Sequence, residues 1–183
     1  MSEDLIIRYC APTLAGIKTG NLFNCDYKSL SDLENIIKEM TIKLESKGVK
    51  IVPLRYSNNR VLIYTYRPSR LELDLKNDKA ISILEEIGYR KSEKCNHLDK
   101  LVERVNNSNE FPHEIGLFLG YPPEDVLGFI KNKGRCSKCT GCWKVYGDAD
   151  RARKLFAMYK RCTRVYGVKW LQGKTLQELT VAV

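Results

Sequence analysis

Apolar side chains recur every three or four residues between positions 31 and 48, which is the spacing of an amphipathic helix. The members of this stripe are Leu33, Ile36, Ile37, Met40 and Leu44. Ser31 and Glu34 have the spacing of a capping box, and Gly48 can end the helix. The pattern therefore predicts one amphipathic helix over this segment.

Two segments rich in β-branched and aromatic residues, 49–56 and 60–66, follow this helix. Such composition is typical of strands, and the polar residues 57–59 between them favour a tight turn. Pro53 lacks a backbone N–H, so we expect it in an edge strand or at a bulge. The sequence predicts an antiparallel hairpin over about residues 49–66.

Helical spacing returns in three shorter segments between residues 69 and 105, separated near Asn77, Gly88 and Asn106. Another helix is expected to start at Pro122, because proline and acidic residues favour the first turn. A long helix is expected over about residues 148–166. Its apolar stripe would consist of Ala152, Leu155, Phe156, Tyr159, Cys162, Val165 and Tyr166.

The remaining segments are less regular. Residues 11–20 contain one proline and two glycines and are predicted to form a shaped turn before a strand at 21–25. Residues 114–121 fit a buried strand or a helical turn equally well, and residues 143–146 fit a strand. Together the elements predict a single α+β domain over residues 1–183, in which a small mixed or antiparallel sheet containing the hairpin is covered by several helices.

Length and composition narrow the class of protein. A chain of 183 residues, 43% of them hydrophobic, can build a core without metals or disulfides. No apolar run approaches the roughly 18 residues of a membrane span, and the acidic N-terminus does not resemble a secretory signal. We therefore expect a cytoplasmic protein with no membrane partner, whose seven cysteines stay reduced.

The positive charge is concentrated in the C-terminal third. Residues 131–174 carry thirteen Lys and Arg against two Asp, a net charge of +11, whereas the rest of the chain carries −2. Such asymmetry predicts a polyanionic partner, either an acidic protein or nucleic acid, although a solvated helix face has the same composition. The candidate partner-binding residues are Lys144, Arg153, Lys154, Lys160, Arg161 and Arg164.

Three cysteines share one short segment inside this basic third. Cys136, Cys139 and Cys142 are spaced so that their thiolates could meet at one metal, with Cys162 as a fourth ligand. The candidate cofactors are Zn or an Fe-S cluster. Reactive thiols and incidental cysteines are the alternatives, since Cys162 also lies on the apolar stripe of its helix.

A second candidate set is catalytic. Cys10 could act as a nucleophile, His113 as its base beside Glu114, and Lys18 could bind an anionic substrate. The structural alternative is that the glycines shape a turn, Cys10 is buried and His113 bonds the backbone. The segment around Lys18 lacks the glycine spacing of a phosphate-binding loop, which excludes nucleotide hydrolysis of that type.

Aromatic residues are interleaved with the basic ones, as in proteins that bind single-stranded nucleic acid. They are Trp143, Tyr146, Tyr159, Tyr166 and Trp170. Two of them, Tyr159 and Tyr166, also fall on the predicted apolar stripe, and no helix-turn-helix or RNP-type motif accompanies them. An RNA-binding module is therefore one alternative function.

Several motifs are shared with a known family. They are CAPTLAGIKTG at 10–20, FPHEIGLFLGYPPEDV at 111–126, WKVYGD at 143–148 and CTRVY at 162–166. On these motifs the chain resembles, over nearly its whole length, a bacterial domain-of-unknown-function family of anaerobic Gram-positive bacteria. The resemblance implies an association with iron and flavodoxin metabolism and no particular site residues.

These observations favour a non-enzymatic accessory or regulatory protein of anaerobic iron and redox metabolism. It would bind a metal, an Fe-S cluster or an acidic redox protein through the basic C-terminal third. A thiol-dependent enzyme built on Cys10 and His113, and an RNA-binding module, are the alternatives.

Overall fold

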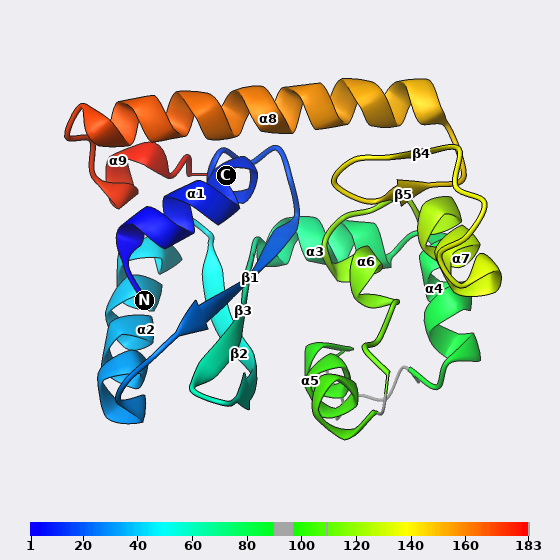
Figure 1. Ribbon diagram of the computed structural model, residues 1–183, viewed down its shortest axis with the longest axis horizontal. Coiled ribbons are helices and arrows are strands. Elements are labelled where there is room, and N and C mark those ends of the chain that lie inside the picture. Colours follow the sequence, from blue (N-terminus) through cyan, green and yellow to red (C-terminus); the bar gives the residue numbers. More distant parts are fainter. Residues whose placement is uncertain (90–96, 109, 183) are drawn as a thin grey trace. The chain divides into compact units, whose positions relative to one another are not determined.

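The predicted hairpin forms two of the three strands of an antiparallel sheet in the computed structural model, which describes residues 1–89, 97–108 and 110–182 (Figure 1). The strands β1 (Gly20–Asp26), β2 (Lys50–Ser57) and β3 (Arg60–Tyr66) are ordered β1-β3-β2. The pairing of β2 with β3 shifts register between Pro53 and Arg55, and β2 is an edge strand. The hairpin and the edge or bulge position of Pro53 are thus confirmed.

The backbone conformation of the hairpin turn suits the pairing of β2 with β3. Asn58 and Asn59 have φ of 49° and 58°. Asparagine tolerates this left-handed conformation better than most residues, and a turn with positive φ at both central positions matches the twist of the flanking strands.

The described chain groups into two compact units. The first comprises residues 1–71 and 157–183, and the second comprises residues 72–156. The chain enters the second unit within α3 (Pro68–Leu75) and leaves it within α8 (Ala149–Leu171), so the second unit is an insertion in the first. The single domain over residues 1–183 stays a prediction.

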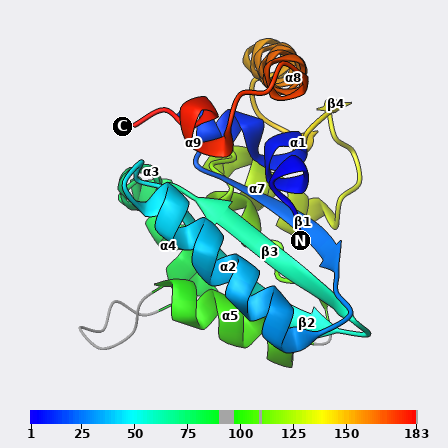
Figure 2. The ribbon, with the colours of Figure 1, turned by 90° about the vertical axis from the view of Figure 1, so that its left-hand side faces the viewer.

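In the first unit, helices cover one face of the sheet. Figure 2 shows α2 (Leu30–Glu45) lying along β3 and β2, while α1 (Glu3–Leu14) packs against β1 and α9 (Leu176–Leu179) against α1. Their apolar faces form one core with the strands, whose members include Ile6, Ile7, Leu14, Phe23, Leu33, Ile37, Met40, Leu44, Ile51, Val61, Ile63, Leu176 and Leu179. The predicted stripe of α2 supplies four of these side chains, which confirms that helix.

The start of α2 differs from the prediction. Ser29 is the N-cap residue, and its hydroxyl accepts a hydrogen bond from the backbone N–H of Asp32 at 3.3 Å. Ser31 lies inside the helix, so the predicted capping box of Ser31 and Glu34 is wrong. Ser29 has an extended backbone, at φ −128° and ψ 130°, as an N-cap residue requires. The N-cap of α2 is therefore two residues earlier than the sequence pattern predicted.

The first helix also extends further than predicted. α1 continues through Pro12 to Leu14, so the predicted turn over residues 11–20 is shortened to residues 15–19. Proline removes one helical hydrogen bond, but Ala11, Pro12, Thr13 and Leu14 are all buried, and this burial outweighs the lost bond.

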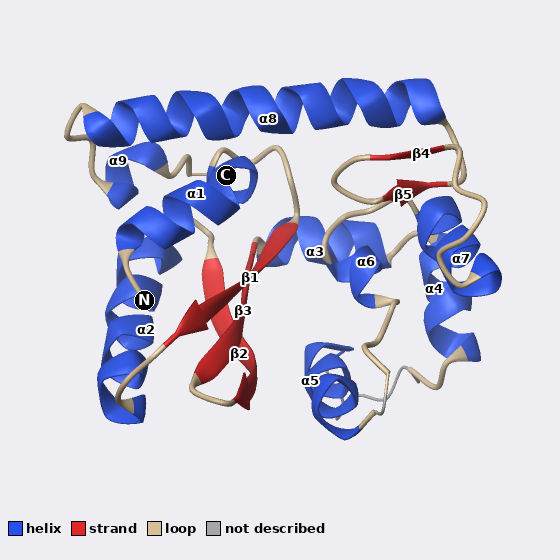
Figure 3. Ribbon diagram, in the orientation of Figure 1, coloured by secondary structure: helices blue, strands red, loops and turns tan. Residues whose placement is uncertain are grey.

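The second unit is mostly helical, with one small hairpin (Figure 3). Its remaining elements are α4 (Asp78–Glu86), α5 (His97–Asn107), α6 (Ile115–Phe118), α7 (Pro123–Asn132), β4 (Cys139–Thr140) and β5 (Lys144–Val145). The helices between residues 69 and 105 and the helix after Pro122 are confirmed. Residues 114–121 contain a helical turn, and the strand at 143–146 is β5, paired with β4. The fold class is α+β, as predicted.

The long helix α8 carries a narrower apolar stripe than predicted. Ala152 and Tyr159 are buried, but Val165 is 40% exposed, so the prediction was wrong at that position. No helix in the described part of the chain is long and apolar enough to cross a membrane.

Candidate functional site

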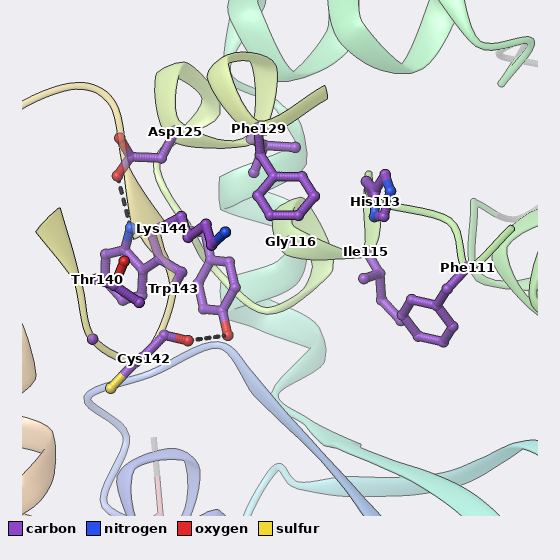
Figure 4. Close-up of a pocket in the computed structure, with 13 residues that line it drawn as sticks. Phe111, His113, Ile115, Gly116, Asp125, Phe129, Thr140, Cys142, Trp143 and Lys144 are labelled. Carbon is purple, nitrogen blue, oxygen red and sulfur yellow. Dashed lines mark hydrogen bonds between the residues drawn. The ribbon is translucent and has the colours of Figure 1, made fainter. Parts of the chain in front are cut away.

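The second unit contains a cavity of about 300 Å³ (Figure 4). Its walls come from three places: residues 111–116 at α6, residues 121–129 at α7, and residues 140–144 in the β4–β5 hairpin. All of these lie within the second unit. We call this space the second-unit cavity; its volume is at the lower end of the range for small-molecule sites.

A buried carboxylate fixes one wall of the second-unit cavity. Asp125, in the first turn of α7, is 3% exposed. Its Oδ2 accepts from Trp143 Nε1 at 2.7 Å, and its Oδ1 accepts from the backbone N–H groups of Tyr146 and Gly147, each at 2.7 Å. Three donors satisfy the buried charge, and together they hold the β4–β5 hairpin against α7.

Aromatic rings form most of the apolar surface. Trp143 stacks on Tyr121 with ring centroids 4.7 Å apart and meets Phe156 edge to face at 4.5 Å. Gly141 makes the second contact possible, because a Cβ on Gly141 would lie 2.2 Å from a ring carbon of Phe156. The opposite side carries Phe129, whose ring meets that of His113 at 4.8 Å.

Lys144 is the cation that lines the second-unit cavity. It is exposed, and its Nζ donates to the carbonyl of Gly134 at 2.6 Å. Gly134 follows the left-handed cap residue of α7, Lys133, so the ammonium lies at the negative end of that helix. Two further N–H groups of Lys144 are free of any described hydrogen bond.

Glu114 does not form a hydrogen bond with His113, its predicted partner; it bonds other residues. Glu114 is 3% exposed and accepts from Tyr89 Oη at 3.1 Å and from Arg104 Nε. Burial, followed by the charge of Glu114, raises the pKa of Tyr89. His113 is exposed and packs against Phe129 instead, so Glu114 joins α5 to the turn before α6 rather than orienting the imidazole.

The predicted nucleophile lies in the other unit. Cys10 is fully buried in α1, and burial raises the pKa of its thiol to about 12. Lys18 is also buried in the first unit, whereas His113 and Glu114 belong to the second. Neither unit by itself contains the whole predicted catalytic set, and Cys10 is protonated at neutral pH.

This environment predicts unequal thiol reactivity. At neutral pH we expect Cys136 and Cys142, which are exposed, to react with iodoacetamide while Cys10 stays unmodified until the protein unfolds. Mass mapping of proteolytic peptides assigns the label to each cysteine. Because the pKa of Cys10 is about 12, its thiol should stay protonated when the pH is raised to about 9. Labelling of Cys10 as fast as Cys136 would contradict its assignment as a core residue.

The four predicted metal ligands are distributed over both units. Cys136 precedes the β4–β5 hairpin, Cys139 is in β4 and Cys142 is in the turn of the hairpin. Cys162 lies in the part of α8 that belongs to the first unit. Burial raises the pKa of Cys162 to about 11, which disfavours the thiolate form that a metal needs. Among the described residues, no three His, Cys, Asp or Glu side chains are grouped so that they could hold a metal. The Zn or Fe-S site stays a prediction.

The predicted partner-binding cations lie mainly on α8. Five of the six are on this helix, and all five side chains are exposed: Arg153, Lys154, Lys160, Arg161 and Arg164. Arg153 forms an ion pair with Asp150 at 2.7 Å. Lys144 belongs to β5 and lines the second-unit cavity, so it is not part of this helix.

Sequence reasoning missed most of the second-unit cavity. Phe111, Tyr121, Asp125 and Phe129 line it, yet none was predicted as a site residue. A usable signal was Gly116 inside an apolar segment, because a glycine within a helical pattern often has a packing reason. A Cβ on Gly116 would lie 2.8 Å from Val126 Cγ2.

Comparison with known proteins gives a family and no activity. The model of the family described as "Protein of unknown function (DUF3793)" matches residues 6–180. No curated protein and no solved structure matches the chain.

Proposed function

Since the chain belongs to this family, whose description assigns no activity, we propose from the arrangement of its own charges that the protein is a non-enzymatic accessory protein. It binds an acidic protein through the cationic face of α8, which consists of the exposed Lys160, Arg161 and Arg164 in the part of that helix that belongs to the first unit. The partner is an acidic redox protein, as expected from the iron and flavodoxin association that the family resemblance implies.

The exposure and spacing of these cations support the proposal. Lys160 and Arg164 are about one helical turn apart, and the four residue steps between them, at about 1.5 Å each, span roughly 6 Å of helix. Within the described residues none of the three cations forms an ion pair, whereas Arg153 on the same helix pairs with Asp150. An acidic surface placed against them would gain charge complementarity and faster association.

The burial of two of the five candidate aromatic residues favours a protein partner over nucleic acid, although the other three, Tyr146, Tyr166 and Trp170, are half-buried. Trp143 and Tyr159 are each 8% exposed, so neither presents an open ring face on which a base could stack. An RNA-binding module remains the second outcome of the experiment below.

A charge-reversal experiment tests the proposal. The triple variant Lys160→Glu, Arg161→Glu, Arg164→Glu is compared with a control, Lys28→Glu, Lys38→Glu, Lys50→Glu. The control changes the net charge equally at three exposed lysines of the same unit. Binding to an acidic ferredoxin and an acidic flavodoxin is measured by calorimetry at about 50 and 200 mM NaCl.

We expect the α8 variant to bind at least about tenfold more weakly than the control, and wild-type affinity to fall with salt. Salt-independent binding, or equal loss in both variants, would rule the proposal out. If single-stranded RNA binds with the same dependence on α8 while both redox proteins fail to bind, the RNA-binding alternative replaces it.

A further inference from the structure

The second-unit cavity combines a flat apolar interior with one cation. The stacked pair of Tyr121 and Trp143 and the ring of Phe129 supply planar surfaces. Gly116 contributes backbone without a side chain, and Ile115 and Val126 are the aliphatic residues. Surfaces of this kind favour a ligand with a planar aromatic ring system, because aromatic rings prefer offset-stacked or edge-to-face neighbours.

The lining of the cavity carries one carboxylate and one ammonium, and they differ in how far their hydrogen bonds are already used. Asp125 is the one carboxylate among its described lining residues, and three donors at 2.7 Å already occupy it. Lys144 donates to one carbonyl and has two N–H groups left for a ligand. A ligand that enters the cavity therefore meets a partly satisfied ammonium and no available carboxylate.

The cavity also limits the size of its occupant. A volume of about 300 Å³ accommodates one or two fused rings with a short substituent. In Figure 4, Phe111 and His113 come from the segment before α6, whereas Thr140, Cys142 and Trp143 come from the β4–β5 hairpin, so the ligand would lie between these two segments.

We propose that the second-unit cavity is a binding site for a small aromatic carboxylate. Its ring system packs against Tyr121 and Phe129, which are half-buried, and its carboxylate accepts hydrogen bonds from the ammonium of Lys144. This inference is independent of the proposed function, because the second-unit cavity and the cationic face of α8 share no residue.

Three probes of matched shape test the ligand class: naphthalene-2-carboxylate, naphthalene-2-carboxamide and naphthalen-2-ylmethylammonium. Binding is measured by calorimetry and by chemical-shift mapping of the amides of residues 111–146. We expect the carboxylate to bind with a Kd on the order of 0.1 mM, and the amide and the ammonium about tenfold or more weakly. Equal binding of all three, or no saturable binding of the carboxylate at millimolar concentration, would overturn the proposal.

Lys144 has a matched control on the same hairpin. Lys138 is also exposed and donates to a carbonyl, that of Gly147 at 2.7 Å, but it does not line the second-unit cavity. We expect Lys144→Met to weaken carboxylate binding about tenfold without changing carboxamide binding, and Lys138→Met to change neither. Lys144→Arg should restore most of the affinity.

Both methionine variants are checked by thermal unfolding, because Lys144 also bonds the segment after α7. If Lys144→Met loses affinity for the carboxylate and the carboxamide equally, the effect is structural and the assignment of Lys144 to the carboxylate is wrong. The full-length protein is used throughout.

Discussion

Replacing Arg67 by methionine is expected to lower the free energy of unfolding by about 4 kcal/mol, measured by urea denaturation. The side chain of Arg67 is fully buried just after β3. It donates to the carbonyls of Thr13, Leu14 and Val181 at 2.7 Å each and to that of Lys47 at 3.0 Å. Methionine would leave all four oxygens without this donor.

The acceptors explain how a buried guanidinium is tolerated there. Thr13 and Leu14 end α1, and Lys47 follows the last residues of α2, so two helix C-termini place partial negative charge around the cation. Burial is the main cause that lowers the pKa of Arg67, followed by the charge of Arg70, but an arginine remains protonated at neutral pH. The residue therefore joins both helices and the C-terminal segment through one side chain.

Two further variants separate the geometry of the guanidinium from its charge. Arg67→Lys keeps the charge but has three donors in a different arrangement, so we expect it to recover less than half of the loss. Arg60→Met, at the other end of β3, removes an exposed ion pair with Asp26 and should cost less than about 1 kcal/mol. Equal stability of Arg67→Met and Arg60→Met would contradict the role assigned to Arg67.

Sequence patterns predicted well those elements that are determined by residues close together in the sequence. The stripe of α2 and the β2–β3 hairpin depend on side chains a few positions apart, and both are confirmed. The errors occurred where distant contacts decide. Pro12 remains helical because α1 is buried in the core, and Val165 is exposed although the period of α8 predicted burial.

Sites depend on distant contacts even more strongly. Arg67 bonds Val181, which is 114 positions away, and no local pattern indicates that pairing. Asp125 was predicted as a first-turn acid of its helix, which is correct, but its bonds to Trp143 and Gly147 join segments 18 and 22 residues apart. Cys10 and His113 carry the right chemistry for a thiol enzyme; the fold assigns them to different units, and the catalytic set stays a prediction.

Replacing Asp125 by alanine is expected to destabilise the protein by about 3 kcal/mol, because three donors in or near the core of the second unit lose their acceptor. Asp125→Asn should cost about 2 kcal/mol. Its amide oxygen can still accept from the backbone of Tyr146 and Gly147, but its NH₂ group would face the Nε1–H of Trp143, so two donors would oppose each other. Asp150→Asn, an exposed acid at the start of α8, is the control and should change stability little.

A double-mutant cycle separates this donor conflict from the general loss of charge. Trp143→Phe removes the indole N–H, so in that background Asp125→Asn no longer places two donors together. We expect the cost of Asp125→Asn to fall by about 1 kcal/mol when Trp143 is already phenylalanine, measured by urea denaturation of the four proteins. An additive cycle would mean that the backbone bonds of Tyr146 and Gly147 hold the hairpin without help from the indole. Coupling would establish that Asp125 orients Trp143, and hence fixes the aromatic wall against which a planar ligand would pack.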